Sequence, residues 1–189
     1  MNRRDILQTV ALIMGGSLVS PTLAGILTKA DTSVDTKKTL IFDAYQENFL
    51  ADLADLIIPT TDTPGAKAAG VGPFINKMLS DCYALKEQNI FKKGLLKIDQ
   101  EAKKAFGKPF LEISISQKTA LLKIAEAEAL DNTQAGNKEP QFFRLLKEIT
   151  LLGYFTSEIG CTQALAYEWV PGRYSGCITL EKGQKPWAT

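Results

Sequence analysis

Apolar side chains recur at three- and four-residue intervals along most of this 189-residue chain, the spacing that places them on one face of an α-helix. Segments with this spacing lie at about residues 40–58, 73–82, 87–106, 114–130 and 140–155. No long alternating β-branched run and no repeat of fixed period interrupts them. The pattern therefore predicts an all-α fold: a single compact domain of about five helices, followed by an irregular C-terminal tail from Val170.

Capping and breaking residues separate these segments. Pro59 cannot occupy a helix interior and is expected to end the first helix. Pro73 suits the first turn of the second helix, and Gly107 is expected to end the third. Ser114 and Gln117 have the spacing of a capping box, which predicts the start of the fourth helix. The fifth segment is the most apolar part of the chain after the N-terminus, so we expect it to be central.

The first thirty residues resemble an export signal. Arg3 and Arg4 precede an uncharged stretch, residues 6–28, whose glycine, serine and proline make it less apolar than a stable membrane span. The arginine pair resembles the twin-arginine consensus of signals that carry folded cargo. We therefore expect residues 1–30 to be a twin-arginine-type signal segment, 31–39 a polar linker and 40–189 the helical domain, with a retained N-terminal anchor as the alternative.

The sequence contains no histidine. This excludes Ser-His-Asp and Cys-His catalysis, histidine-based zinc or iron sites and CxxCH haem attachment. The 22 basic and 21 acidic side chains leave a net charge of +1, which argues against nucleic acid or an anionic membrane surface as the partner. We therefore predict no catalytic, cofactor-binding or metal-binding residue, and expect a chain that scaffolds, escorts or binds.

The three cysteines, Cys82, Cys161 and Cys177, show no CxxC spacing. In an oxidising periplasm Cys161 and Cys177 could form a disulfide that closes a short C-terminal loop and leaves Cys82 as a buried thiol. Three unpaired core thiols are an equally good interpretation, because cysteine is among the most buried residue types.

The segment PTTDTPGA, residues 59–66, is rich in turn-forming residues. It is interpreted either as a rigid capped loop or as a contact with a partner protein, and the GxxxxGK spacing of a phosphate-binding loop is absent. The candidate contact residues are Thr60, Thr61, Asp62, Thr63, Pro64 and Gly65.

Two later segments are also candidates for partner contact. GYFTSEIG, residues 153–160, places a glycine inside an apolar helix, which indicates either close packing within the chain or a docking surface. YEWVPGRYSGC, residues 167–177, concentrates residue types enriched at interface hot spots, which could cover the chain's own core or reach another chain. The candidates are Gly153, Tyr154 and Phe155 in the first segment and Tyr167, Trp169, Arg173 and Tyr174 in the second.

Taken in order, the arginine pair, IIPTTDTPGA, AGV, GYFTSE and YEWVPGRYSGC resemble the gluconate 2-dehydrogenase subunit 3 family. The resemblance implies a small, cofactor-free subunit of a periplasmic flavoprotein dehydrogenase. It implies a large partner of the glucose-methanol-choline type that carries FAD, often with a multi-haem cytochrome c subunit that accepts the electrons. Where relatives carry a lipobox cysteine, this chain has Leu23-Ala24-Gly25-Ile26, so lipid anchoring is not expected.

The resemblance and the composition lead to one expectation. The chain would be a non-catalytic small subunit of a gluconate, sugar or polyol dehydrogenase complex, using the twin-arginine translocon to escort the folded large subunit to the periplasm and stabilising it there. Association with the membrane would come through the complex or an uncleaved signal. An autonomous periplasmic helical binding protein and an autonomous enzyme that uses carboxylates remain the alternatives.

Overall fold

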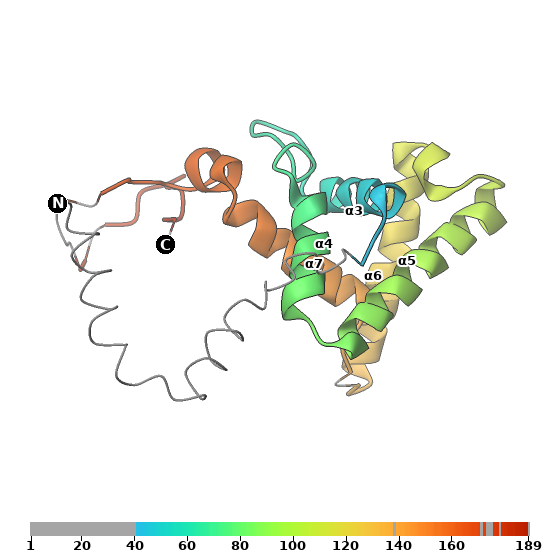
Figure 1. The fold of residues 1–189 in the computed structure, drawn as a ribbon. Helices are drawn as coiled ribbons and strands as arrows, with labels where there is room; N and C mark the ends of the chain where they lie inside the picture. Colours follow the sequence, from blue (N-terminus) through green and yellow to red (C-terminus); the bar gives the residue numbers. More distant parts are fainter. Residues whose placement is uncertain (1–40, 138, 171, 173–175, 178, 189) are drawn as a thin grey trace, which may run out of the picture. The chain divides into compact units, whose positions relative to one another are not determined.

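The computed structural model describes residues 41–137, 139–170, 172, 176–177 and 179–188. The expected signal segment with Arg3 and Arg4, the linker at 31–39, and the tail residues Arg173 and Tyr174 lie outside these ranges. The elements in chain order are α3 (Ala44–Ile57), α4 (Val71–Cys82), α5 (Leu85–Phe106), η1 (Phe110–Glu112), α6 (Ile115–Gln134), α7 (Phe142–Phe155) and η2 (Gly160–Ala164) (Figure 1). The described residues contain no strand and one isolated bridge, between Ala166 and Trp187, so the all-α prediction is confirmed.

Side-chain caps fix where two of the helices begin. The predicted capping box at α6 is confirmed, since the Ser114 amide donates to Gln117 Oε1 at 3.0 Å and the Gln117 amide donates to Ser114 Oγ at 3.4 Å. A second capping box, not anticipated from the sequence, starts α3. There the Gln46 amide donates to Asp43 Oδ1 at 2.8 Å and the Asp43 amide donates to Gln46 Oε1 at 3.2 Å.

The helix α7 is central, as its apolar sequence predicts. It contacts α3, α4, α5 and α6, and Leu146 and Ile149 on it are fully buried. Large side chains of α3, α4 and α5 are also fully buried, and α6 adds Leu121 and Leu122 to the same cluster, so the helices share one core. These residues include Leu50, Leu53, Ile75, Leu79, Phe91 and Ile98.

The buried side chain of an asparagine in α4 fixes the backbone directly before α3. Asn76 of α4 is 0% exposed, and its Nδ2 donates to the Phe42 carbonyl oxygen at 3.0 Å while the Phe42 amide donates to Asn76 Oδ1 at 3.2 Å. Ser80, one turn later, accepts from the Ile41 amide at 3.3 Å. The Phe42 side chain is buried beside the ring of Phe91. These contacts fix the backbone at residues 41–42, directly before α3.

Several large apolar residues within the predicted helical segments are exposed at the surface. Tyr45 is 48% exposed and Leu96 57%, because the faces of α3 and α5 that meet other helices are narrower than their apolar stripes. Cys82, expected to be a buried thiol, is exposed at the last position of α4. On α7, Leu152 and Phe155 are also partly exposed, at 43% and 39%.

Candidate partner-binding surface

The loop between α3 and α4 is held rigidly by hydrogen bonds to its own residues. The Gly65 amide donates to Thr60 Oγ1 at 2.9 Å, and the Ala66 amide donates to the Ile58 carbonyl oxygen at 2.9 Å. A Cβ at position 65 would lie 2.6 Å from Asp55 Oδ1 and 2.7 Å from the Thr60 nitrogen, so only glycine fits. The turn residues in PTTDTPGA thus build the loop itself.

The same hydrogen bonds decide whether the loop could hold a phosphate or a nucleotide. A phosphate-binding loop presents several free backbone N–H groups to the anion. Here the consecutive amides of residues 65, 66 and 67 donate to Thr60 Oγ1, the Ile58 carbonyl and Asp55 Oδ1. The amides of residues 65–67 are therefore not free to bind an anion.

Tyr154 connects the loop to the second candidate motif. Its hydroxyl donates to the Pro64 carbonyl oxygen at 2.9 Å and lies 3.2 Å from Thr63 Oγ1, while the residue as a whole is only 2% exposed. Gly153 beside it is buried against α4, where an added Cβ would lie 2.5 Å from Phe74 Cδ1. Both residues are buried within the chain, in agreement with close packing as the reason for the glycine.

The rest of GYFTSEIG caps the end of α7. Thr156 Oγ1 donates to the Leu152 carbonyl oxygen at 2.7 Å, and Ser157 Oγ donates to the Tyr154 carbonyl oxygen at 2.6 Å. Both carbonyls also accept backbone N–H groups, from Thr156 and Ser157 at 3.1 Å each, so the hydroxyls add a second hydrogen bond to each of these carbonyls at the end of the helix. Phe155, in contrast, is 39% exposed, with its ring edge-on to that of Tyr154 at a centroid distance of 5.2 Å.

The residues that remain available to another protein lie on the loop and on the last turns of α7. Thr60, Thr61 and Asp62 are exposed, and Thr63 and Pro64 are half-buried. Two further apolar residues, Leu151 and Leu152, are 39% and 43% exposed. Neither leucine stands out in the sequence, because both belong to a helical segment that is apolar along its whole length. We call Thr60, Thr61, Asp62, Leu151, Leu152 and Phe155 the docking surface.

A charged cluster lies beside the loop, where α3 meets α6. Lys118 Nζ and Lys67 Nζ each lie 2.6 Å from an oxygen of Asp52, and Lys118 also stands 5.3 Å above the Phe110 ring centroid. Burial alone would raise the pKa of Asp52, but the hydrogen bonds from Lys118 and Lys67 outweigh it and hold that pKa below its ordinary value. An open groove of about 570 Å³ borders the cluster and is also lined by Thr60 and Ile115.

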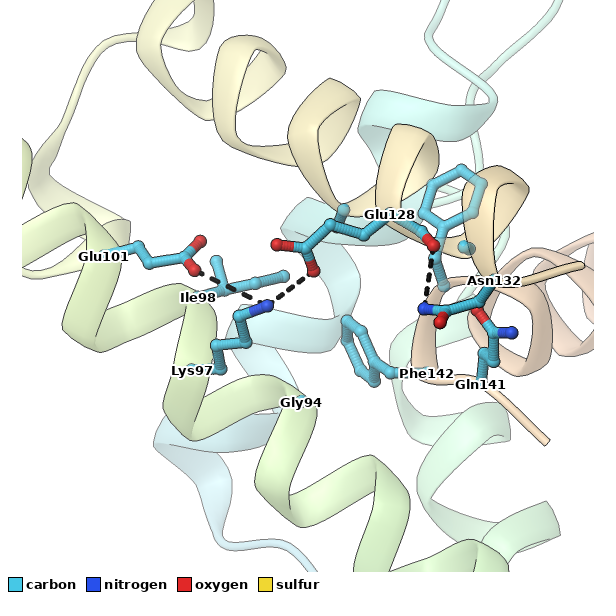
Figure 2. A pocket seen from close by; sticks show the side chains of 11 residues that line it. Gly94, Lys97, Ile98, Glu101, Glu128, Asn132, Gln141 and Phe142 are labelled. Carbon is cyan, nitrogen blue, oxygen red and sulfur yellow. Dashed lines mark hydrogen bonds and ion pairs between the residues drawn. The ribbon is translucent and has the colours of Figure 1, made fainter. Parts of the chain in front are cut away.

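A second groove, of about 180 Å³, lies among α5, α6 and the start of α7 (Figure 2). Figure 2 shows Lys97 of α5 between Glu101 of the same helix and Glu128 of α6, with ion pairs to both. Phe142 forms the apolar side of the groove. The charged side chains of this groove pair with one another and join α5 to α6. We therefore assign the groove to the packing of these helices and not to ligand binding.

The tail candidates are only partly within the described ranges. Tyr167 is 46% exposed and Trp169 84%, so neither covers the chain's own core. Cys161 is half-buried and Cys177 exposed; both are free thiols in the structure, and their pairing stays a prediction.

In the described ranges, no helix has the length and apolar character needed to cross a bilayer. Nor do three or more acidic or cysteine side chains of that part of the chain gather as a metal site would require.

Comparison with known proteins identifies one matching family. The family model for gluconate 2-dehydrogenase subunit 3 matches residues 44–172, from the first residue of α3 to the start of the tail. No curated protein and no solved structure is significantly similar to the chain. The match covers the five α-helices of the described residues, the first two candidate motifs and the first six residues of the third, so the chain belongs to the gluconate 2-dehydrogenase subunit 3 family.

Proposed function

We propose that this chain is the non-catalytic small subunit of an FAD-dependent gluconate, sugar or polyol dehydrogenase complex. In this proposal it binds the large flavin-bearing subunit, carries it through the twin-arginine translocon in folded form and stabilises it in the periplasm. A cytochrome c subunit would take the electrons from the flavin. Membership of the family supports the place in a dehydrogenase complex.

The observation that carries the docking role is the hydrogen bond between Tyr154 and Pro64. It joins two motifs 90 residues apart, so that the loop and the end of α7 form one rigid surface. Phe155, Leu151 and Leu152 are left exposed on the last turns of the helix that carries Tyr154. A pre-organised surface loses little conformational entropy on binding, and partly exposed apolar side chains gain from being covered.

The charge balance supports the same role. With 22 basic and 21 acidic side chains, the chain has no strong field that would favour a polyanionic partner. Permanent subunit interfaces depend chiefly on apolar burial and are about 2,000 Å² or larger. The docking surface would supply part of that area.

The subunit role is tested by purifying the tagged full chain from its native extract and identifying what accompanies it. We expect a flavoprotein dehydrogenase in stoichiometric amount, with flavin fluorescence and turnover of sugar or polyol donors. Turnover by the isolated small chain, or a functional monomer without such a companion, would overturn the proposal in favour of an autonomous protein.

The escort role is tested separately by the double substitution Arg3→Lys and Arg4→Lys. The arginine pair is the feature that twin-arginine signals require, so the large subunit should remain in the cytoplasm although its own sequence is unchanged. Normal periplasmic dehydrogenase activity in this double variant would refute the escort role and leave the subunit role standing.

The docking surface is tested with Phe155→Ala and Leu152→Ala. Leu96→Ala is the matched control, because Leu96 is 57% exposed on α5, a helix that contributes no residue to the docking surface. An interface anchor contributes about 2 kcal/mol or more, so we expect at least roughly tenfold weaker retention of the large subunit for the first two variants. Equal retention by all three variants would exclude this surface.

A further inference from the structure

The end of the chain is tied back to the residues that follow η2. The Ala166 amide donates to the Pro186 carbonyl oxygen at 2.8 Å, and the Ala188 amide donates to the Ala166 carbonyl oxygen at 2.9 Å. Lys185 Nζ adds a hydrogen bond to the Gln163 carbonyl oxygen at 2.5 Å. The backbone near Trp187 is thus held beside residues 163–166 although the segment lacks regular secondary structure.

This tied segment exposes several large apolar side chains, which we call the tail surface: Tyr167 (46% exposed), Trp169 (84%), Val170 (70%), Leu180 (82%) and Trp187 (53%). Aromatic side chains can each bury about 150–250 Å², so together these residues leave on the order of 600 Å² in water. Each partner in a standard protein interface contributes about 800 Å². The tail surface is therefore large enough to provide most of one side of an interface.

We propose that the tail surface is a second docking site for the flavin-bearing subunit, reached independently of the loop and α7. This inference rests on the proposed function. The occupant is a folded protein surface with apolar pockets that accept the indole of Trp169 and the side chains beside it. Trp and Tyr are the residue types that most often dominate binding energy when such pockets cover them.

The charges around the tail surface favour a protein over a lipid membrane as the occupant. Residues 163–188 carry two acidic side chains, Glu168 and Glu181, and three basic ones, Arg173, Lys182 and Lys185, a net charge of only +1. Binding to an anionic membrane would require an excess of lysine and arginine. Binding through the tail surface should also be insensitive to salt, because it depends on apolar contact.

The range of the family match divides the tail surface into two parts. The match ends at residue 172, so Tyr167, Trp169 and Val170 lie inside it, whereas Leu180 and Trp187 lie beyond it. The bridge between Ala166 and Trp187 brings the unmatched segment beside the matched one. The tail surface thus combines residues inside and outside the matched range.

The test compares Trp169→Ala and the double variant Leu180→Ala/Trp187→Ala with the control Leu85→Ala, whose side chain is 75% exposed on α5. Each tagged full chain is purified from the native extract at low and high salt, and the flavin-containing dehydrogenase subunit is quantified. The bridge uses only backbone atoms, so circular dichroism and the thermal midpoint should be unchanged. We expect at least tenfold less of the large subunit with the tail variants, at both salt concentrations, and no loss with the control.

Three results would overturn the inference. Retention of the large subunit by both tail variants while Phe155→Ala loses it would refute the tail surface alone and leave the proposed function intact. Absence of any dehydrogenase subunit with the unaltered chain would refute both. Flotation of the unaltered chain with vesicles of phosphatidylcholine and phosphatidylglycerol, lost in Trp169→Ala, would identify a membrane as the occupant.

Discussion

The hydroxyl of Tyr154 donates a hydrogen bond of 2.9 Å to the carbonyl oxygen of Pro64, and this contact joins the end of α7 to the loop that follows α3. The loop has its own internal hydrogen bonds, including one from the Thr61 amide to the Thr63 carbonyl oxygen at 3.0 Å. The tyrosine therefore determines where an already folded loop is held, rather than how it folds.

Replacing Tyr154 by phenylalanine removes only the hydroxyl. The Pro64 carbonyl and Thr63 Oγ1 then lose a partner in a part-buried site, so the free energy of unfolding should fall by about 1–2 kcal/mol. Amide exchange at residues 60–66 should become faster than in the unaltered chain. Chemical denaturation and hydrogen exchange measure the two effects, with Tyr45→Phe as the control because Tyr45 is 48% exposed. Unchanged stability would show that the hydroxyl does not hold the loop.

Replacing Gly153 by alanine tests the contact between α7 and α4. Alanine is favoured over glycine within a helix by about 1 kcal/mol. Its Cβ, however, would lie 2.5 Å from Phe74 Cδ1, and overpacking costs about 1–3 kcal/mol. We expect net destabilisation in denaturant titration, relieved by adding Phe74→Leu. Gly172→Ala is the control, since a Cβ there meets nothing within 4 Å; stabilisation by Gly153→Ala would mean that the two helices can separate freely.

Thr150 carries a buried hydroxyl without a hydrogen-bond partner among the described residues, and the residue is 0% exposed on α7. Valine has nearly the same shape and no polar atom to desolvate. Thr150→Val should therefore leave the thermal midpoint unchanged or raise the stability by up to about 1 kcal/mol. Thr150→Ser keeps the hydroxyl and loses the methyl group, so it should be less stable than both. A marked loss in Thr150→Val would mean that the hydroxyl does have a partner in solution.

Local patterns predicted the elements of the fold well. The helical spacing located the five α-helices of the described residues, and Ser114 with Gln117 gave the start of α6 because a capping box is made by residues close in sequence. The same argument would have found the start of α3, since Asp43 and Gln46 have the equivalent spacing. These features depend on interactions within one helical turn, which the sequence shows directly.

Contacts between distant residues could not be predicted in this way. Nothing near Tyr154 in the sequence indicates Pro64 as its partner, and nothing near Asp52 indicates Lys118, 66 residues later. The exposed Leu152 was also missed, because α7 is apolar on almost every side at its C-terminal end. An apolar pattern indicates burial, but it does not say whether the chain itself or another protein covers the side chain.

The ion pairs of Asp52 predict how the stability of the fold depends on pH. Burial raises the pKa of this carboxyl, but hydrogen bonds from Lys118 and Lys67 more than offset it, so the pKa in the folded chain lies below the ordinary 3.8. A carboxyl with a lowered pKa stabilises the fold at pH values above its unfolded pKa, and loses that contribution as the pH falls through its folded pKa. Asp52→Asn should therefore lower the free energy of unfolding by about 1.5–3 kcal/mol near neutral pH, the contribution of hydrogen bonds to charged groups.

The stability difference between Asp52→Asn and the unaltered chain should shrink as the pH falls below about 4, because the carboxylate of the unaltered chain then becomes protonated and loses its charge. At high pH the change in folding stability depends on Lys67, whose pKa is raised above 10.5 chiefly by its hydrogen bond with Asp52. That lysine stabilises the fold below 10.5 and stops doing so as the pH rises through its folded pKa. Denaturant titrations of the unaltered chain, Asp52→Asn and the exposed control Asp62→Asn across this range measure both limits. A difference between the first two chains that stays constant from acid to neutral pH would show that Asp52 acts through packing and not through its charge.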